Sequence, residues 1–292
     1  MSTATPRDRA SFGERVGAAL AERGRLCVGI DPHAHLLDRW GLDDNAEGAR
    51  EFGLRVVDAA HGRVGFVKPQ VAFFERFGSV GFAALERIIH DAREAELVVI
   101  ADAKRGDIGS TLDGYADAWL RPGSPLESDA VTLTPYLGFS SLRATIDFAR
   151  QNDKGVFVLA ATSNPEATGL QTARVDSGGT VASRIVDAAA GVNHAASGGK
   201  THAGAVGDVG VVLGATVDFA GARIDLGALA GPPATPILAP GFGTQGAQYG
   251  EIARLYREAA PSVIASSSRS ILEAGQSGLA EAIHRANDEL SR

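Results

Sequence analysis

Short apolar runs recur along the whole chain, and each is followed by a turn rich in Gly, Pro or Asp and then by a helix-like pattern. There are eight such runs, at residues 26–30, 64–68, 97–102, 130–133, 156–160, 209–213, 237–239 and 263–265. They are nearly continuous in apolar residues and do not alternate, which is typical of parallel strands that are buried on both faces. The pattern therefore predicts eight parallel β-strands.

The segments between these strands include amphipathic helix candidates, at residues 81–96, 142–152, 180–196 and 249–260. Eight strands that alternate with helices favour a closed (β/α)8 TIM barrel of the α/β class over an open doubly wound sheet. A Gly-rich stretch at 197–207 falls between a helix and a strand, and we interpret it as a long loop. We expect residues 1–292 to form a single barrel domain with a short N-terminal arm.

Composition and charge are those of an ordinary globular enzyme, with 292 residues of which 45% are hydrophobic, and a net charge of −7. Nothing supplies the basic stripe that a nucleic-acid binder needs, so we expect no nucleic-acid partner. No stretch approaches a membrane span, and residues 1–15 lack the apolar core of a signal peptide. The single cysteine, Cys27, cannot form an intrachain disulfide and is predicted to be buried. These features predict a cytoplasmic protein without a membrane partner.

Polar residues follow several of the predicted strands. In a TIM barrel the carboxyl ends of all strands meet at one mouth, where active sites lie. The residues that we expect at this mouth come from six strands and are Asp31, Lys68, Asp102, Lys104, Ser163, the loop 240–246 and Arg269.

The strand at 97–102 leads directly into four charged residues within six positions, Asp102 to Asp107. Many strand ends simply enter a solvated charged loop, and Lys68 alone could be a lysine that extends from a strand end into water. However, Asp102 and Lys104 share strand parity, so both are predicted to point to the same side of the barrel. This alternation favours a functional pair.

The run Asp102-x-Lys104-x-x-Asp107-Ile108 resembles the signature of the orotidine 5′-phosphate decarboxylase family, and the longer segment 102–111 is similar to its longer bacterial subgroup. Further segments in the family's order carry the resemblance along the barrel, at residues 29–32, 67–70, 134–138, 162–165, 240–246 and 268–271. Any one of these tetrapeptides is a weak signal, whereas six in the correct order are a strong one.

The resemblance implies a decarboxylation without metal or cofactor, in which C6 of the orotate ring loses carbon dioxide and uridine 5′-phosphate forms in de novo pyrimidine biosynthesis. Lys104 would stabilise the anion on the ring and donate a proton to C6. Asp102 and Asp107 would favour the charged form of Lys104, and Lys68 would complete an alternating Lys-Asp-Lys-Asp row.

The same resemblance implies a homodimer with twofold symmetry, in which Asp107 and Thr111 reach into the neighbouring site. On the substrate, Asp31 would bind the ribose hydroxyls and Ser163 the pyrimidine edge, although Ser163 could instead cap a helix before Pro165. The predicted phosphate end consists of residues after the last two strands, where TIM barrels often bind phosphate. They are Pro240, Gln245, Ser268 and Arg269.

Two alternatives remain open from the sequence. One is a magnesium-dependent sugar-phosphate decarboxylase or lyase of the same superfamily, whose members place an acidic residue where this chain has Lys68, a cation that disfavours a metal. The other is a non-catalytic barrel that binds nucleotides. The histidine pairs 33/35 and 194/202 lack an accompanying acidic or cysteine ligand set, and we interpret them as surface residues.

Overall fold

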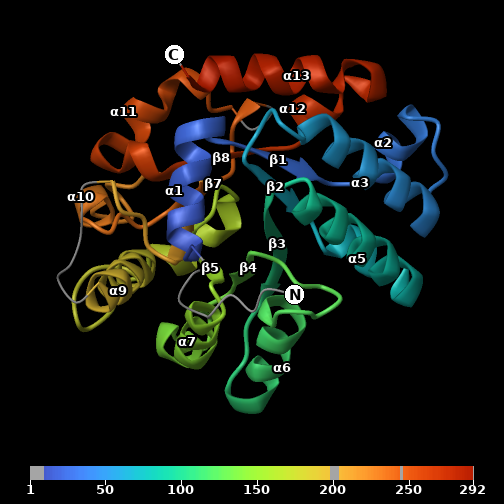
Figure 1. The fold of residues 1–292 in the computed structure, drawn as a ribbon. Coiled ribbons are helices and arrows are strands. Elements are labelled where there is room, and N and C mark those ends of the chain that lie inside the picture. Colours follow the sequence, from blue (N-terminus) through green and yellow to red (C-terminus); the bar gives the residue numbers. More distant parts are fainter. Residues whose placement is uncertain (1–9, 198–203, 244–245, 292) are drawn as a thin grey trace.

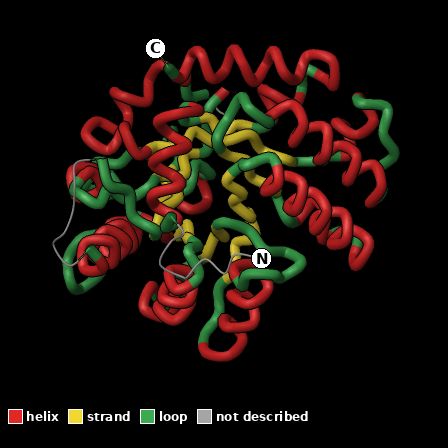
Figure 2. The backbone as a smooth tube through the Cα atoms, viewed as in Figure 1, coloured by secondary structure: helices red, strands yellow, loops and turns green. Residues whose placement is uncertain are grey.

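The computed structural model describes residues 10–291 apart from 198–203 and 244–245. Its centre is a closed barrel of eight parallel strands in the order of the chain, and β1 closes the barrel against β8. Figure 2 shows the strands gathered in the middle with helices around them. The strands are β1 (Leu26–Ile30), β2 (Phe66–Pro69), β3 (Val98–Arg105), β4 (Ala130–Leu133), β5 (Gly155–Ala161), β6 (Val209–Leu213), β7 (Ile237–Ala239) and β8 (Val263–Ser267). The prediction of a TIM barrel is confirmed.

Helices follow the strands and cover the outside of the barrel (Figure 1). The α-helices are α1 (Phe12–Arg23), α2 (Ala34–Arg39), α3 (Ala46–Ala60), α4 (Ala72–Glu75), α5 (Gly78–Glu94), α6 (Gly109–Leu120), α7 (Arg143–Gln151), α8 (Thr168–Gln171), α9 (Val181–Ala196), α10 (Leu226–Ala230), α11 (Ile252–Tyr256), α12 (Arg269–Leu272) and α13 (Gly275–Leu290). Short 3-10 helices are η1 (Phe139–Leu142), η2 (Pro165–Ala167), η4 (Tyr249–Glu251) and η5 (Arg257–Ser262). Among the described helices, none combines the length and the apolar character that crossing a membrane requires.

Strand β3 is longer than the sequence predicted. It continues through the charged run to Arg105, and its register against β4 shifts between Ala101 and Arg105. Lys104 takes a positive φ of 48° within this shift, which is uncommon for a residue other than glycine. The first charges of the run therefore belong to the barrel wall and not to a loop.

The predicted continuous helix at 249–260 is wrong. The chain forms η4, α11 and η5 in succession instead. Arg257 has a φ of 47°, which ends α11, and Pro261 has no N–H to donate to a continuing helix. Helical periodicity persists across the break because the same face still packs on the barrel.

Helix α1 closes the end of the barrel opposite the predicted mouth, and in Figure 1 it lies in front of the strands. Phe12 is fully buried in the barrel interior and packs edge-on against Phe157, with ring centroids 6.1 Å apart. Gly155 makes room for this ring, because a Cβ there would lie 2.1 Å from Phe12 Cδ1. Arg15 fixes the helix through an ion pair of 2.5 Å with Asp129. The described part of the N-terminal arm is thus a plug for the barrel floor.

Cys27 lies inside the barrel, fully buried and unpaired, as predicted. Burial raises the pKa of its thiol to about 12, so the sulfur is a neutral packing group at physiological pH.

Candidate active site

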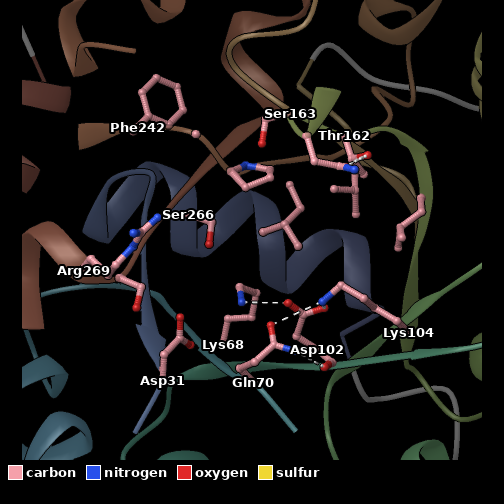
Figure 3. A pocket seen from close by; sticks show the side chains of 17 residues that line it. Asp31, Lys68, Gln70, Asp102, Lys104, Thr162, Ser163, Phe242, Ser266 and Arg269 are labelled. Atoms are coloured by element: carbon pink, nitrogen blue, oxygen red, sulfur yellow. Dashed lines mark hydrogen bonds and ion pairs between the residues drawn. The ribbon is translucent and has the colours of Figure 1, made fainter. Parts of the chain in front are cut away.

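A cavity of about 320 Å³ opens at the carboxyl ends of the strands (Figure 3). It brings together eight of the residues predicted from the sequence, namely Asp31, Lys68, Asp102, Lys104, Ser163, Pro240, Ser268 and Arg269. The expected gathering of polar strand ends at one mouth therefore holds for these positions.

The Asp102 carboxylate lies between two lysines, as Figure 3 shows. Lys68 Nζ is 2.9 Å from Asp102 Oδ2, and Lys104 Nζ is 2.7 Å from Asp102 Oδ1. Thr132 Oγ1 on β4 donates a further hydrogen bond of 2.9 Å to Asp102 Oδ1. The side chains of Lys68 and Asp102 are each 10% exposed, whereas that of Lys104 is 45% exposed. Lys104 is thus the member of the cluster that is most accessible to a ligand in the cavity.

Neighbouring strands hold Lys104 in its unusual backbone conformation. Its N–H donates to Thr132 Oγ1 at 2.9 Å, so one hydroxyl joins the backbone of Lys104 to the carboxylate of Asp102. Gln70, just past β2, donates to the Asp102 carbonyl at 3.2 Å and accepts from Lys104 Nζ at 3.3 Å. These contacts stabilise a left-handed residue that would otherwise cost about 1–3 kcal/mol. Gln70 and Thr132 were not predicted as site residues.

Electrostatics keep both buried members of the cluster charged. Burial by itself would lower the pKa of Lys68, but Asp102 and then Asp31 outweigh it and raise that pKa above its usual value. Burial would likewise raise the pKa of Asp102, but Lys68 and Lys104 hold it well below its usual range. The cavity floor therefore holds Asp102 and Lys68 as a charged pair, and the Lys104 side chain contacts the same carboxylate.

The opposite side of the cavity carries Asp31, Ser268 and Arg269, as Figure 3 shows for Asp31 and Arg269. Asp31 Oδ1 and Ser268 Oγ are buried and have no hydrogen-bond partner within the described parts of the chain. Gly29 lets the two groups approach, because a Cβ there would lie 2.6 Å from Ser268 Cβ and 3.3 Å from Asp31 Oδ1. Since buried polar atoms are normally paired, these two oxygens indicate hydrogen bonds to a bound ligand.

The wall between these two ends is apolar. Leu159, Val212 and Leu238 point inward from β5, β6 and β7 and line the cavity. The sequence did not single out these residues, because an inward apolar residue at a strand end looks the same as one in the core. This wall suits the flat face of a ring, with polar groups left at either end.

Other predicted site residues lie elsewhere. Asp107 is half-buried and accepts a hydrogen bond of 2.8 Å from the Ile108 N–H, Thr111 is exposed on α6, and neither lines the cavity. Gln245 lies outside the described residues. The roles assigned to these three residues remain predictions.

The histidines offer no metal site in the part of the chain that the structure describes, where no three His, Cys, Asp or Glu side chains gather around one point. His35 and His194 are exposed, as interpreted, and His202 lies outside the described residues. His33 is half-buried instead, with its ring centroid 4.2 Å from that of Phe73, and burial lowers its pKa. The interpretation of His33 as a surface residue therefore holds only in part, because its ring also packs against Phe73 on α4.

Comparison with known proteins decides the family. The model of the orotidine 5′-phosphate decarboxylase / HUMPS family matches residues 24–284. The chain belongs to this family. An orotidine 5′-phosphate decarboxylase of Salinispora arenicola is 49% identical over 265 residues, which cover 91% of each chain. One of a Nocardioides species is 48% identical over 283 residues, which cover 96% of this chain and 98% of that one.

A crystal structure from Streptomyces avermitilis shows the same fold, with a TM-score of 0.90 and 42% identity over 100% of this chain and 98% of that chain. The family that was predicted from six motif segments in the correct order is confirmed. The lysines and carboxylates of the cavity are thus those of an orotidine 5′-phosphate decarboxylase / HUMPS family member.

Proposed function

We propose that the chain decarboxylates orotidine 5′-phosphate to uridine 5′-phosphate in pyrimidine biosynthesis, without a cofactor. Two curated relatives that match nearly the whole chain carry the name of this activity. The observation that carries the proposal is the Asp102 carboxylate held between Lys68 and Lys104 on the cavity floor. Chemistry that creates a carbanion without an electron sink needs a preorganised cation at that place.

Lys104 performs the central step in this proposal. The bond between C6 and the carboxylate carbon breaks, carbon dioxide leaves, and the electron pair stays on C6. The ammonium group of Lys104 stabilises this pair and transfers a proton to C6, and water then returns a proton to the lysine. Asp102 orients Lys104 through the 2.7 Å contact, and Lys68 and Thr132 hold Asp102 in turn.

The far end of the cavity binds the rest of the nucleotide. Arg269 lies across the cavity from Lys104 in Figure 3 and offers a planar fork for phosphate oxygens. Asp31 and Ser268, whose buried oxygens have no partner among the described residues, are placed to bind ribose and phosphate groups. Ser163 takes the pyrimidine edge, and Pro240 and Gln245 belong to the loop beside the phosphate. Binding energy from the phosphate then serves to align C6 with Lys104.

The site is completed by a second copy of the chain. Asp107 and Thr111 do not line the cavity of their own chain. Exposed apolar side chains lie beside Asp107 in the sequence and on the loop that follows β4. Ile108 is 61% exposed and Tyr136 is 75% exposed. The two loops are in contact, because a Cβ on Gly106 would lie 2.4 Å from the Thr134 carbonyl oxygen. Exposed apolar side chains on these two contacting loops support a symmetric dimer in which each chain contributes to the neighbouring site.

Mixing two inactive variants tests this dimer. Lys104→Ala lacks the proton donor of its own site, and Asp107→Asn lacks the group given to the partner. After co-refolding, half of the dimers are mixed and each has one intact site, so about a quarter of wild-type activity returns. Mixed dimers that are demonstrated but inactive would contradict the shared site.

An absorbance assay with orotidine 5′-phosphate tests the reaction itself. We expect turnover that a chelator leaves unchanged. Loss of activity on chelation would favour the magnesium-dependent lyase, and absence of turnover in a protein that binds uridine 5′-phosphate would favour a non-catalytic barrel. A cytoplasmic location stays a prediction, which fractionation of the producing cells tests.

A further inference from the structure

The loop after β5 carries Ser163 to the cavity, and a side chain behind this loop holds it. Thr162, Ser163 and Asn164 line the cavity. The same three residues separate it from a second cavity of about 450 Å³, which Gln171 lines from the end of α8. Gln171 does not line the first cavity, so it acts on a ligand there only through the loop.

Both polar atoms of the Gln171 amide bind one residue, Thr162. Gln171 Oε1 accepts from the Thr162 N–H at 2.9 Å, and Gln171 Nε2 donates to Thr162 Oγ1 at 3.0 Å. Thr162 Oγ1 donates in turn to Asn164 Oδ1 at 2.7 Å. The residues on either side of Ser163 are therefore joined to each other and to α8. Two bonds to one residue fix the orientation of the amide as well as its position.

The end of β6 supports the same loop from another direction. Gly214 donates its N–H to the Ala161 carbonyl at 2.9 Å. A Cβ on Gly214 would lie 3.0 Å from the Ser163 nitrogen and 3.2 Å from Ser163 Cβ, which is closer than most side chains allow. Ser163 thus lies between a close backbone contact at Gly214 and the Gln171–Thr162 pair, and its backbone has little room to move.

We propose that Gln171 is a positioning residue that sets Ser163 for hydrogen bonding to the pyrimidine base. The proposal rests on the proposed function, because it requires a pyrimidine nucleotide in the cavity. It separates two parts of the ligand: the base depends on the loop that Gln171 holds, whereas the phosphate depends on Arg269 and the loops after β7 and β8. Loss of Gln171 should therefore weaken binding of the base and leave binding of the sugar phosphate unchanged.

The test compares uridine 5′-phosphate with ribose 5-phosphate as inhibitors of wild type, Gln171→Ala and Gln171→Glu. We expect Gln171→Ala to bind uridine 5′-phosphate about tenfold more weakly, the scale of one to two lost hydrogen bonds, with ribose 5-phosphate changed less than about twofold. kcat/KM for orotidine 5′-phosphate falls by a similar factor. Gln171→Glu keeps an acceptor for the Thr162 N–H and recovers most of the loss.

A substitution at Thr162, the residue that Gln171 contacts, covers the case in which Gln171→Ala does not fold. Thr162→Val removes the hydroxyl that Gln171 Nε2 contacts and keeps the backbone N–H. We expect it to weaken binding of uridine 5′-phosphate about threefold and to leave binding of ribose 5-phosphate unchanged. Equal losses for both ligands, or none, would overturn the positioning role. A wild-type protein that binds ribose 5-phosphate as tightly as uridine 5′-phosphate would instead contradict the proposed function.

Discussion

Replacing Asp102 by asparagine is the sharpest perturbation of the charged cluster, because it keeps the shape of the side chain and removes its charge. The carboxylate contacts Lys68 at 2.9 Å and Lys104 at 2.7 Å. The side chain of Lys68 is 10% exposed, whereas that of Lys104 is 45% exposed. The cost of the substitution therefore comes mainly from Lys68, which stays buried with its charge.

Removing one partner of a buried ion pair costs about 3–5 kcal/mol, because the remaining charge has no compensation. The exposed Lys104 adds less than about 1 kcal/mol, since solvent screens it. Against a total stability of about 5–15 kcal/mol, the variant should still fold. With a urea slope of about 3 kcal/mol/M, the unfolding midpoint falls by about 1–1.7 M.

The pH dependence of the stability loss gives a second readout, because the shift in the pKa of Lys68 has opposite signs in the wild type and in the variant. In the wild type the pKa of Lys68 is raised, so its contribution to stability is complete below the unfolded value of about 10.4 and is lost only above it. In Asp102→Asn burial is opposed mainly by Asp31, and we expect the pKa of Lys68 to fall below its usual value. The unfolding free energy of the variant then rises relative to wild type as the pH increases toward 10.

Urea unfolding of both proteins between pH 6 and 10, followed by circular dichroism, measures both effects. Asp117→Asn is a matched control, because it breaks an exposed ion pair between Asp117 on α6 and Arg121 just after that helix, and should cost less than about 1 kcal/mol. If Asp102→Asn is as stable as this control, or if its deficit does not shrink with rising pH, the assignment of a buried charged lysine is refuted.

Two further predictions concern the two ends of the barrel. Arg269→Ala should lower kcat/KM for orotidine 5′-phosphate by about 100-fold through lost charge-assisted hydrogen bonds and affect the phosphate-free nucleoside far less, and equal losses on both substrates would remove Arg269 from the phosphate site. Phe12→Ala should lower the unfolding free energy by about 3–5 kcal/mol with KM nearly unchanged, because the ring is fully buried at the end of the barrel away from the cavity; a change in KM as large as that in stability would contradict this placement.

The local sequence pattern predicted the strands and the pairing of Asp102 with Lys104 well. The bounds of β1, β4, β6 and β7 match the apolar runs, because a strand buried on both faces of a parallel barrel is apolar at nearly every position. The strand parity of Asp102 and Lys104 correctly brought them to one side, even though Lys104 has a positive φ. Parity depends only on neighbouring residues, which is why it could be predicted.

Contacts between distant segments could not be predicted in the same way. Thr132 reaches Asp102 only because β4 pairs with β3 in a shifted register, and Gln171 reaches Thr162 through the fold of a loop. Ser11 and Glu14 form a capping box at the start of α1, which the sequence analysis did not identify. Helix α1 can close the barrel floor only because Gly155, more than a hundred residues away, leaves room for Phe12.

The central claim is that Lys104 carries the decarboxylation, and the turnover of orotidine 5′-phosphate by purified Lys104→Ala tests it most directly. Loss of both the stabilising charge and the proton donor predicts a fall in kcat of at least about 10⁴-fold, with an unchanged circular dichroism spectrum and uridine 5′-phosphate binding within about tenfold of wild type. A folded Lys104→Ala variant that retains a tenth or more of the wild-type kcat would contradict the account.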